Sequence, residues 1–343
     1  MFAKILEAFY VKVLVNIILK QSTTVVYIEV HSKKGAINSA HAEFDTLEPN
    51  EKMLDFIEQY TRESPYYYIA LLDISSLQGA LPTCSKAKLP EYYDLSSCDY
   101  KCYDGKWTYY TATSEIMEIQ KRFEEPGIDF IFSPFVILAK FFEDKIAGSL
   151  ALYVLVCDRY ISLAIFEEGA LRFAEHLEME EGFNTEDILE NEEIEEEENA
   201  FDLDMEDGID LESLDVDDEA SELEEFGDIE DLDSLEEIEE FDESKDLEEE
   251  LLESEDSLED AAEESFNNDY QRFSFIQTAV DHYYKDDRYE SNFLENIYIA
   301  DAIGVSKDLK KYLEEEMFLN VYIRHIEIDA ELCELTREEL GLV

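Results

Sequence analysis

The amino-acid sequence predicts an α/β protein with two similar halves and a long acidic insertion in the second half. Three observations lead to this prediction. Two pairs of β-rich runs, one turning near Gly35 and one near Gly169, predict that each half begins with a β-hairpin. Helix-like and strand-like segments alternate after each hairpin, which is typical of α/β folds. Residues 181–265 contain 44 of the 88 acidic residues and a single basic residue, Lys245.

The charge is concentrated in the acidic insertion. The chain has 343 residues and a formal net charge of -62, far more than one compact domain normally carries. Residues 181–265 account for most of that charge, so the remainder is a moderately acidic globular protein. Such a charge repels phosphate backbones, and we therefore expect no direct binding to nucleic acid or to an anionic membrane except through a local basic patch. Basic partners and divalent cations are favoured instead.

The first 22 residues are apolar but do not predict a bilayer span. Lys4, Lys12 and Lys20 interrupt the run too often for about 20 consecutive apolar residues. Two interpretations stay open for residues 1–22. They form either a helix or strand packed on the domain, or an amphipathic helix that contacts a membrane or a partner.

The first half is predicted over residues 23–150. It begins with the hairpin that turns at Lys33-Lys34-Gly35, where glycine tolerates the positive backbone angle of a tight turn. Residues 80–105 contain Pro82, Pro90 and several aromatic residues, and we expect an irregular excursion there. The remaining segments predict a helix at 50–62, a buried strand at 66–75, a strand at 106–114, a helix at 115–125, and a short strand and helix around Pro134.

The second half begins with the hairpin of residues 151–180 and resumes after the insertion at residues 266–343. In the hairpin, Asp158 closes a hydrophobic run and Glu168-Gly169 supplies the turn. The later part predicts a helix at 269–285, a strand at 296–303, a glycine turn, a helix at 306–317 with Ser306 as its cap, a strand at 320–328, and a short closing helix.

The acidic insertion, residues 181–265, is predicted to be largely disordered. Its apolar residues from Leu223 recur at every third position, which winds around a helix instead of forming one buried stripe. Two roles stay open: a passive solubilising insert, or a docking tract for a basic partner whose short helices form on binding. The candidate docking residues are Phe226, Ile229, Leu232, Leu235, Ile238 and Phe241.

The five cysteines and five histidines do not predict a metal or nucleophilic site. No signal peptide is recognisable, so we interpret the cysteines, at 84, 98, 102, 157 and 333, as reduced cytoplasmic thiols. Cys84, Cys98 and Cys102 lack suitably spaced partners for a zinc site with four ligands. The histidines show no metal spacing, and no G-x-S-x-G motif is present.

Three stretches resemble a known family. "GIDFIFSPFVILAKFF", "VLVCDRYISLAIFEEGALRFAEHL" and "ENIYIADAIGVSKDLKKYLEEEMFLNVYI" resemble segments of the actin-like proteins PilM and GspL of type IV pilus and type II secretion assembly. The resemblance implies the actin-like (ribonuclease H-like) fold of two subdomains, with a nucleotide cleft formed by two hairpins and a glycine-rich loop.

The same resemblance implies where a nucleotide would bind, and the residues there depart from the family pattern. Glu29, Asp158 and Gly304 stand at the three corners. In the first hairpin, His31-Ser32 replaces a glycine turn; in the second, Arg159-Tyr160 replaces small residues; the third has one glycine. Structural alternatives are that Glu29 is a solvated strand residue, that Asp158 caps a turn, and that Arg159 pairs with Asp158 or a surface carboxylate instead of a phosphate. We therefore expect no cofactor, with Mg-ATP disfavoured, and no catalytic activity.

The leading hypothesis is a non-catalytic cytoplasmic scaffold, peripheral at the inner membrane, for assembly of a type IV pilus, a type II secretion system or a DNA-uptake machine. The resemblance implies as partner the cytoplasmic tail of a bitopic membrane protein, and indirectly the assembly ATPase. Two alternatives are an active actin-like ATPase of the same system, and a charge-driven interaction protein that acts through residues 181–265. The sequence leaves self-association open.

Overall fold

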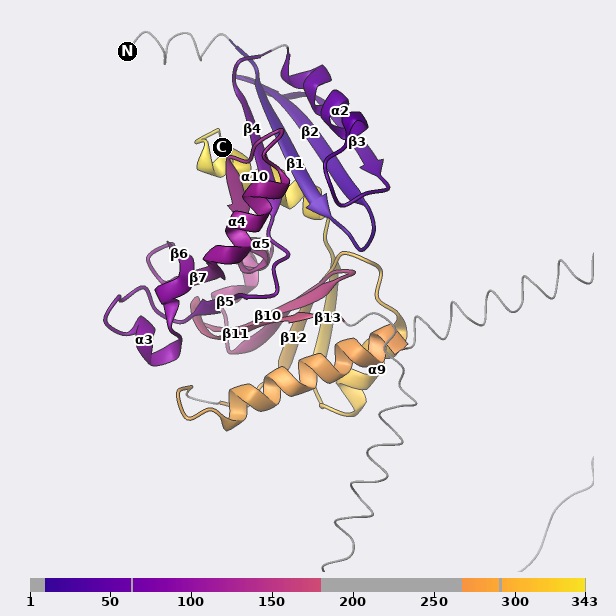
Figure 1. Ribbon diagram of the computed structural model, residues 1–343. Coiled ribbons are helices and arrows are strands. Elements are labelled where there is room, and N and C mark those ends of the chain that lie inside the picture. Colours follow the sequence, from indigo (N-terminus) through magenta and orange to yellow (C-terminus); the bar gives the residue numbers. More distant parts are fainter. Residues whose placement is uncertain (1–9, 63, 180–266, 290–291, 343) are drawn as a thin grey trace, which may run out of the picture. The chain divides into compact units, whose positions relative to one another are not determined.

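The computed structural model describes residues 10–62, 64–179, 267–289 and 292–342 (Figure 1). Residues 1–9 and the acidic insertion, including the candidate docking residues Phe226, Ile229, Leu232, Leu235, Ile238 and Phe241, lie outside the described residues. Among the residues that the structure describes, none of the helices has both the length and the apolar character of a bilayer span.

The first half is built on a five-stranded sheet in the order β3-β2-β1-β4-β8. The first three strands are antiparallel neighbours, and β4 and β8 run parallel to β1. The strands are β1 (Lys12–Leu19), β2 (Thr24–Ser32), β3 (Gly35–Phe44), β4 (Tyr67–Leu72) and β8 (Phe130–Phe132).

The second half repeats this topology in the order β11-β10-β9-β12-β13. Its first three strands are again antiparallel, and its last two run parallel to β9. The strands are β9 (Ala151–Val156), β10 (Tyr160–Glu167), β11 (Ala170–Glu178), β12 (Asn296–Asp301) and β13 (Asn320–His325). Two copies of one hairpin-led sheet form the duplicated arrangement that the predicted actin-like fold requires.

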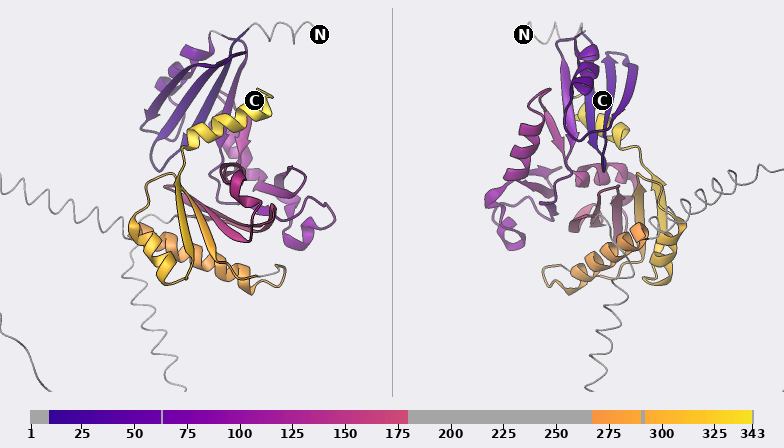
Figure 2. Two further views of the ribbon diagram at one scale, coloured as in Figure 1. Left: turned by 180° about the vertical axis from the view of Figure 1, so that it is seen from behind. Right: turned by 45° about the vertical axis from the view of Figure 1, so that its right-hand side comes forward.

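Each sheet buries one face under its own pair of helices. The helices α2 (Glu51–Thr61) and α4 (Thr113–Arg122) cover the first sheet, and α9 (Lys307–Glu315) and the helix over residues 267–285 cover the second. A third core joins the two sheets through α5 (Pro134–Phe141), the short α6 (Glu143–Ile146) and α10 (Ile328–Glu339). Figure 2 shows α10 lying across the strands of the first sheet.

Side-chain caps place the starts of three helices. Asn50, Ser133 and Ser306 each accept a backbone N–H of the first turn, so the helices begin directly after them. Pro134 opens α5 instead of breaking it, because the first helical position needs no N–H donor. The predicted cap at Ser306 is confirmed, whereas the closing helix is longer than predicted and begins at Ile328.

The N-terminal segment corrects the predicted start of the first half. Residues Lys12–Leu19 are not an amphipathic surface helix but β1, the central strand of the first sheet, and seven of its eight residues are buried. The interpretation as a packed strand is therefore confirmed for this part. The predicted hairpin around Gly35 exists as β2–β3, with Gly35 at a φ of 116°, but it is preceded by a second hairpin, β1–β2.

The predicted irregular excursion is partly wrong, because it contains a small sheet. β5 (Gln78–Leu81), β6 (Cys98–Tyr103) and β7 (Trp107–Ala112) pair antiparallel in the order β5-β7-β6. Only the connection between β5 and β6 is irregular, with the short helix α3 (Leu89–Tyr92) and the 3-10 turn η1 (Leu95–Ser97).

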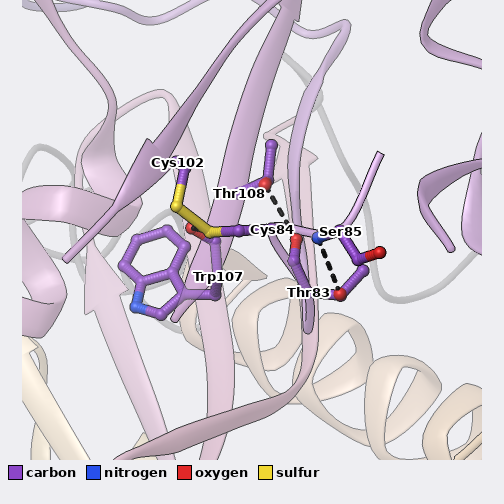
Figure 3. The surroundings of a disulfide bond; sticks show 6 residues. All are labelled: Thr83, Cys84, Ser85, Cys102, Trp107 and Thr108. Atoms are coloured by element: carbon purple, nitrogen blue, oxygen red, sulfur yellow. Dashed lines mark hydrogen bonds between the residues drawn. A yellow bond between two sulfur atoms is a disulfide. The ribbon is translucent and has the colours of Figure 1, made fainter. Parts of the chain in front are cut away.

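The interpretation of all five cysteines as reduced thiols is wrong for two of them. Cys84 and Cys102 form a disulfide that ties the connection after β5 to strand β6 (Figure 3). Cys98, Cys157 and Cys333 carry free thiols. Spacing could not reveal the pair, because the two positions become neighbours only when β5 and β6 both pair with β7.

Candidate functional site

A cavity of about 220 Å³, here called the cleft, lies at the carboxyl ends of β1, β9, β12 and β13. Ligands of α/β proteins bind at this edge of the sheets. The volume is below the roughly 300 Å³ at which small-molecule pockets usually begin. The cleft is therefore in the expected place for a nucleotide but is small for one.

The first corner of the cleft is the β1–β2 turn, where the N–H of Lys20 donates to the carbonyl of Thr23 at 2.9 Å. Lys20 Nζ lies 3.7 Å from the carboxylate of Glu43, and the hydroxyl of Thr23 donates to that carboxylate at 2.7 Å. The hydrogen bond from Thr23, supported by Lys20, lowers the pKa of Glu43. The cation of the first corner, Lys20, therefore already has a carboxylate partner, Glu43 of β3.

The second corner is the β9–β10 turn at Asp158-Arg159. Cys157 donates its N–H to the carbonyl of Tyr160 at 3.0 Å, which closes a two-residue turn. Arg159 lies 3.6 Å from the carboxylate of Glu178 on β11, so the predicted pairing with a surface carboxylate is observed. Asp158 is exposed, lines the cleft, and makes no hydrogen bond with any residue that the structure describes, and so does not act as the turn cap.

The third corner is the loop after β12, where the chain supplies its own anion. The buried carboxylate of Asp301 accepts the N–H groups of Ile303, Gly304 and Val305 at 3.0, 2.8 and 3.0 Å. Gly304 has a φ of 82°, a conformation that glycine adopts without strain. These N–H groups are of the kind that bind a phosphate in glycine-rich loops, and here they bind a carboxylate.

A second buried carboxylate extends this network to the next position. Asp269, on the helix over residues 267–285, accepts the N–H of Ser306 at 3.1 Å and pairs with Arg272 at 2.7 Å. Asp269 is 1 % exposed and Arg272 is 7 % exposed. The four N–H groups from Ile303 to Ser306 are therefore all satisfied by carboxylates of the chain.

Glu29, predicted at the first corner, is not at the cleft. It lies on β2, where it is 8 % exposed, and it contacts His31 Nε2 at 2.6 Å and Arg337 of α10 at 3.3 Å. Nearby, the hydroxyl of Thr336 donates to the side-chain oxygen of Asn16 at 3.3 Å. The interpretation of Glu29 as a solvated strand residue is therefore also wrong, because this carboxylate fixes α10 on the first sheet.

The charges around the cleft disfavour a polyphosphate. Its two cations, Lys20 and Arg159, have carboxylate partners, and the carboxylates of Asp158, Glu327 and Asp329 also line it. Burial raises the pKa of the Cys157 thiol to about 12, so this lining thiol is neutral. Of the three predicted nucleotide residues, Asp158 lines the cleft, Gly304 directly follows the lining residue Ile303, and Glu29 lies outside the lining.

A larger concavity, here called the groove, lies between the small sheet, α5 and α10. It has a volume of about 580 Å³, well within the range of ligand sites. Its apolar side is aromatic: the rings of Tyr103 and Trp107 are 4.7 Å apart, and Tyr109 is 6.1 Å from Trp107. Trp107 is 2 % exposed, so the groove rests on a rigid hydrophobic base.

Two lysine–carboxylate bridges define the polar side of the groove. Lys140 of α5 lies 2.7 Å from Glu338 of α10, and the hydrogen bond between them raises the pKa of Lys140. Lys101 of β6 lies 2.8 Å from Glu339, which joins two walls of the groove. Because Lys101 and Glu339 are both exposed, this bridge is worth less than about 1 kcal/mol and a ligand can displace it.

A comparison with protein-family models places the chain. The model of the domain of unknown function DUF8341 matches residues 152–341, more than half of the chain. The chain belongs to the DUF8341 family. A second model, of the domain of unknown function DUF8569, matches residues 9–139. The two matches correspond to the two repeated sheets, so each half of this DUF8341 protein has its own sequence signature. A comparison with curated protein sequences finds no match.

Solved structures of the actin-like fold are similar to this DUF8341 protein. A protein of unknown function with an actin-like ATPase fold from Bacteroides thetaiotaomicron is 12% identical, with 96% of this chain and 97% of that chain covered and a TM-score of 0.44. A chain of the PilM–PilN type IV pilus biogenesis complex is 11% identical, with 96% of this chain and 96% of that chain covered and a TM-score of 0.46. MreB 5 of Spiroplasma citri bound to AMPPNP is 10% identical, with 96% of this chain and 97% of that chain covered and a TM-score of 0.37. The repeated five-stranded sheets, each led by a hairpin, confirm the predicted α/β fold of two similar halves.

The sequence did not predict the roles of Asp301, Lys20 and Glu43 around the cleft of this DUF8341 chain, where Lys20 is a lining residue. Asp301 was part of the quoted loop "IADAIGVS", but its role was not predicted. A signal was present, since an aspartate that ends a strand three residues before a lone glycine often accepts the N–H groups of the following turn. Lys20 and Glu43 had no local signal, because their pairing depends on the register of β2 and β3.

Proposed function

We propose that this chain is a non-catalytic scaffold of actin-like fold that binds the cytoplasmic tail of a bitopic membrane protein. It would act at the cytoplasmic face of the inner membrane in assembly of a type IV pilus, a type II secretion system or a DNA-uptake machine. The sequence resemblance to PilM and GspL supports the choice of machine. The observation that carries the non-catalytic role is the occupation of the loop after β12 by Asp301 and Asp269.

The proposed lack of nucleotide binding has a physical basis in competition between anions. A triphosphate would have to displace the carboxylate of Asp301 from three N–H groups and separate Lys20 from Glu43 and Arg159 from Glu178. The displaced carboxylates would remain beside the bound phosphates and repel them. An intramolecular carboxylate also costs no association entropy, which favours it over a free anion.

The groove supports tail binding better than the cleft does. It is more than twice as large, and one of its walls is β6, an edge strand of the small sheet among the described residues. The free backbone groups of an edge strand can pair with an extended peptide, while the apolar base holds its side chains. An extended tail with apolar residues therefore fits this site.

Charge selects among such tails. Four carboxylates, of Asp104, Glu143, Glu338 and Glu339, line the groove beside the three lysines Lys101, Lys106 and Lys140, and the chain as a whole is strongly acidic. Segments on the cytoplasmic side of a membrane span are rich in Lys and Arg. We therefore expect the tail to combine apolar residues with basic ones, so that its lysines or arginines replace Lys101 as partners of the groove carboxylates.

Two titrations of the full chain test the proposal. Calorimetric titration with Mg-ATP is expected to show no saturable binding at micromolar nucleotide; saturable binding would refute the non-catalytic role. In the second titration, the full chain is added to fluorescence-labelled peptides of the cytoplasmic tails of pilus and secretion assembly proteins, and binding is followed by the fluorescence of the label. One tail should bind, and Tyr103→Ala in the groove should weaken it at least tenfold. Tyr100→Ala is the matched control, because Tyr100 is an exposed residue of β6 outside the groove lining.

A further inference from the structure

The Cys84–Cys102 disulfide lies at the wall of the groove. Cys102 lines the groove on β6, and Cys84 follows β5, with its Sγ 3.2 Å from the carbonyl oxygen of Trp107. Figure 3 shows the sulfur bridge beside the indole of Trp107. Cys84 is half-buried and Cys102 is exposed. A soluble thiol can therefore approach the bridge from the side of Cys102.

Besides the ladder with β7, the side chains that hold β6 are Lys101, which pairs with Glu339 of α10, and Tyr103, which packs on Trp107. The four central residues of β6, Asp99 to Cys102, are exposed, so the strand buries little apolar surface. Among the described residues its backbone pairs with β7 alone, so the other side of β6 is an edge of the small sheet. The hydrogen bond from the Thr108 hydroxyl to the Thr83 carbonyl at 2.7 Å joins the connection after β5 to β7 and does not reach β6. The disulfide is thus the covalent tie between strand β6 and the connection after β5, in addition to the β6–β7 ladder.

We propose that this disulfide is a redox-sensitive lock that sets the shape of the groove. A cellular dithiol would supply the electrons. Its thiolate attacks Sγ of Cys102, the Cys84–Cys102 bond breaks, and Cys84 leaves as a thiolate that takes up a proton. The second thiol of the reductant then attacks the mixed disulfide. Two cysteine thiols and one oxidised dithiol result, so electrons and atoms balance.

The reduced state differs from the oxidised one in a defined segment. The freed Cys84 thiol can donate to the Trp107 carbonyl that it already contacts, so β5 and β7 keep their pairing. Strand β6 loses its covalent tie and gains freedom to open from β7. Lys101, Cys102 and Tyr103 move with it, and these residues form one wall of the groove.

The redox sensitivity has a physical basis in the location of the bridge. Exposed disulfides exchange with thiols more readily than buried ones, and disulfides in reducing compartments are usually transient or redox-sensing. The meaning of the lock for partner binding rests on the proposed function. The conformational effect does not, because it concerns the unliganded chain alone.

Hydrogen exchange of the full chain, without nucleotide or peptide, tests the lock. Dithiothreitol is expected to speed amide exchange in residues 98–103 at least tenfold and to leave β9 and β12 unchanged. Trp107, the only tryptophan of the chain, should change its emission in step. The double variant Cys84→Ser/Cys102→Ser should behave like the reduced chain in the absence of reductant. Cys98→Ser, on the same strand but outside the bridge, should keep the response of the original chain.

Two results would overturn the lock. One is unchanged exchange of residues 98–103 on reduction, and the other is faster exchange throughout the chain, which would make the disulfide a general stabiliser. Neither result bears on the titrations with Mg-ATP and tail peptides, so a failure of this inference is distinguishable from a failure of the proposed function.

Discussion

Replacing Asp301 tests the idea that a carboxylate of the chain takes the place of a phosphate. Asp301→Ala removes the acceptor of three backbone N–H groups in the loop after β12. An unsatisfied buried N–H costs about 1–3 kcal/mol, but Gly304 is exposed and water can reach its N–H. We therefore expect the free energy of unfolding to fall by about 3 kcal/mol. Asp301→Asn keeps one oxygen acceptor and should cost about half as much.

The assay is urea unfolding of the full chain followed by circular dichroism, together with the melting temperature. A loss of about 3 kcal/mol corresponds to a decrease of roughly 6–12 °C for a protein of this size. Asp158→Ala is the matched control, because Asp158 is an exposed aspartate of the cleft without a hydrogen bond to the described residues, and it should change stability by less than about 0.5 kcal/mol. Equal effects of the two substitutions would refute the structural role of Asp301.

Two further predictions concern other parts of the molecule. Burial lowers the pKa of His176 to about 4, below its ordinary value of 6.5, so the unfolded state binds the proton more readily than the folded state. The free energy of unfolding should therefore fall by about 3 kcal/mol as pH drops from 6.5 to 4. His176→Gln should flatten this pH dependence in urea unfolding. Glu29→Ala should lower the free energy of unfolding by about 2 kcal/mol in the same assay, because it leaves Arg337 without its carboxylate partner. The heats of Mg-ATP titration should stay unchanged. Altered heats would indicate that Glu29 contributes to a nucleotide site.

Periodicity and turn residues predicted most of the secondary structure, because those signals are local. The hairpin of β10 and β11 was predicted with its turn, since Glu168 and Gly169 both adopt positive φ, where glycine is favoured. The helix caps at Ser306 and the strand of residues 296–303 followed from equally local signals. The sequence therefore predicts two hairpin-led halves, although it does not predict the order of the strands in each sheet.

The site was predicted less well, because its residues meet through strand register and not through spacing. The first corner was assigned near Gly35, since a glycine turn is the stronger local signal, whereas the turn that reaches the cleft contains Lys20 and no glycine. Glu29 was assigned to that corner for the same reason. Its actual partner, Arg337, lies 308 residues away in the chain. The bridge from Cys84 to Cys102 likewise depends on the pairing of β6 with β7.

The two halves pair the cation beside the cleft with a carboxylate in the same way. In each half the turn after the first strand carries a cation, Lys20 or Arg159, and the third strand supplies its carboxylate, Glu43 or Glu178. In both halves that carboxylate comes from an antiparallel neighbour and is held by the sheet itself. A nucleotide would have to break both pairs at once, and each exposed pair is weak alone, at less than about 1 kcal/mol. The decisive barrier is therefore Asp301, whose three hydrogen bonds are partly buried, and removal of this one side chain should do more to admit an anion than removal of either surface carboxylate.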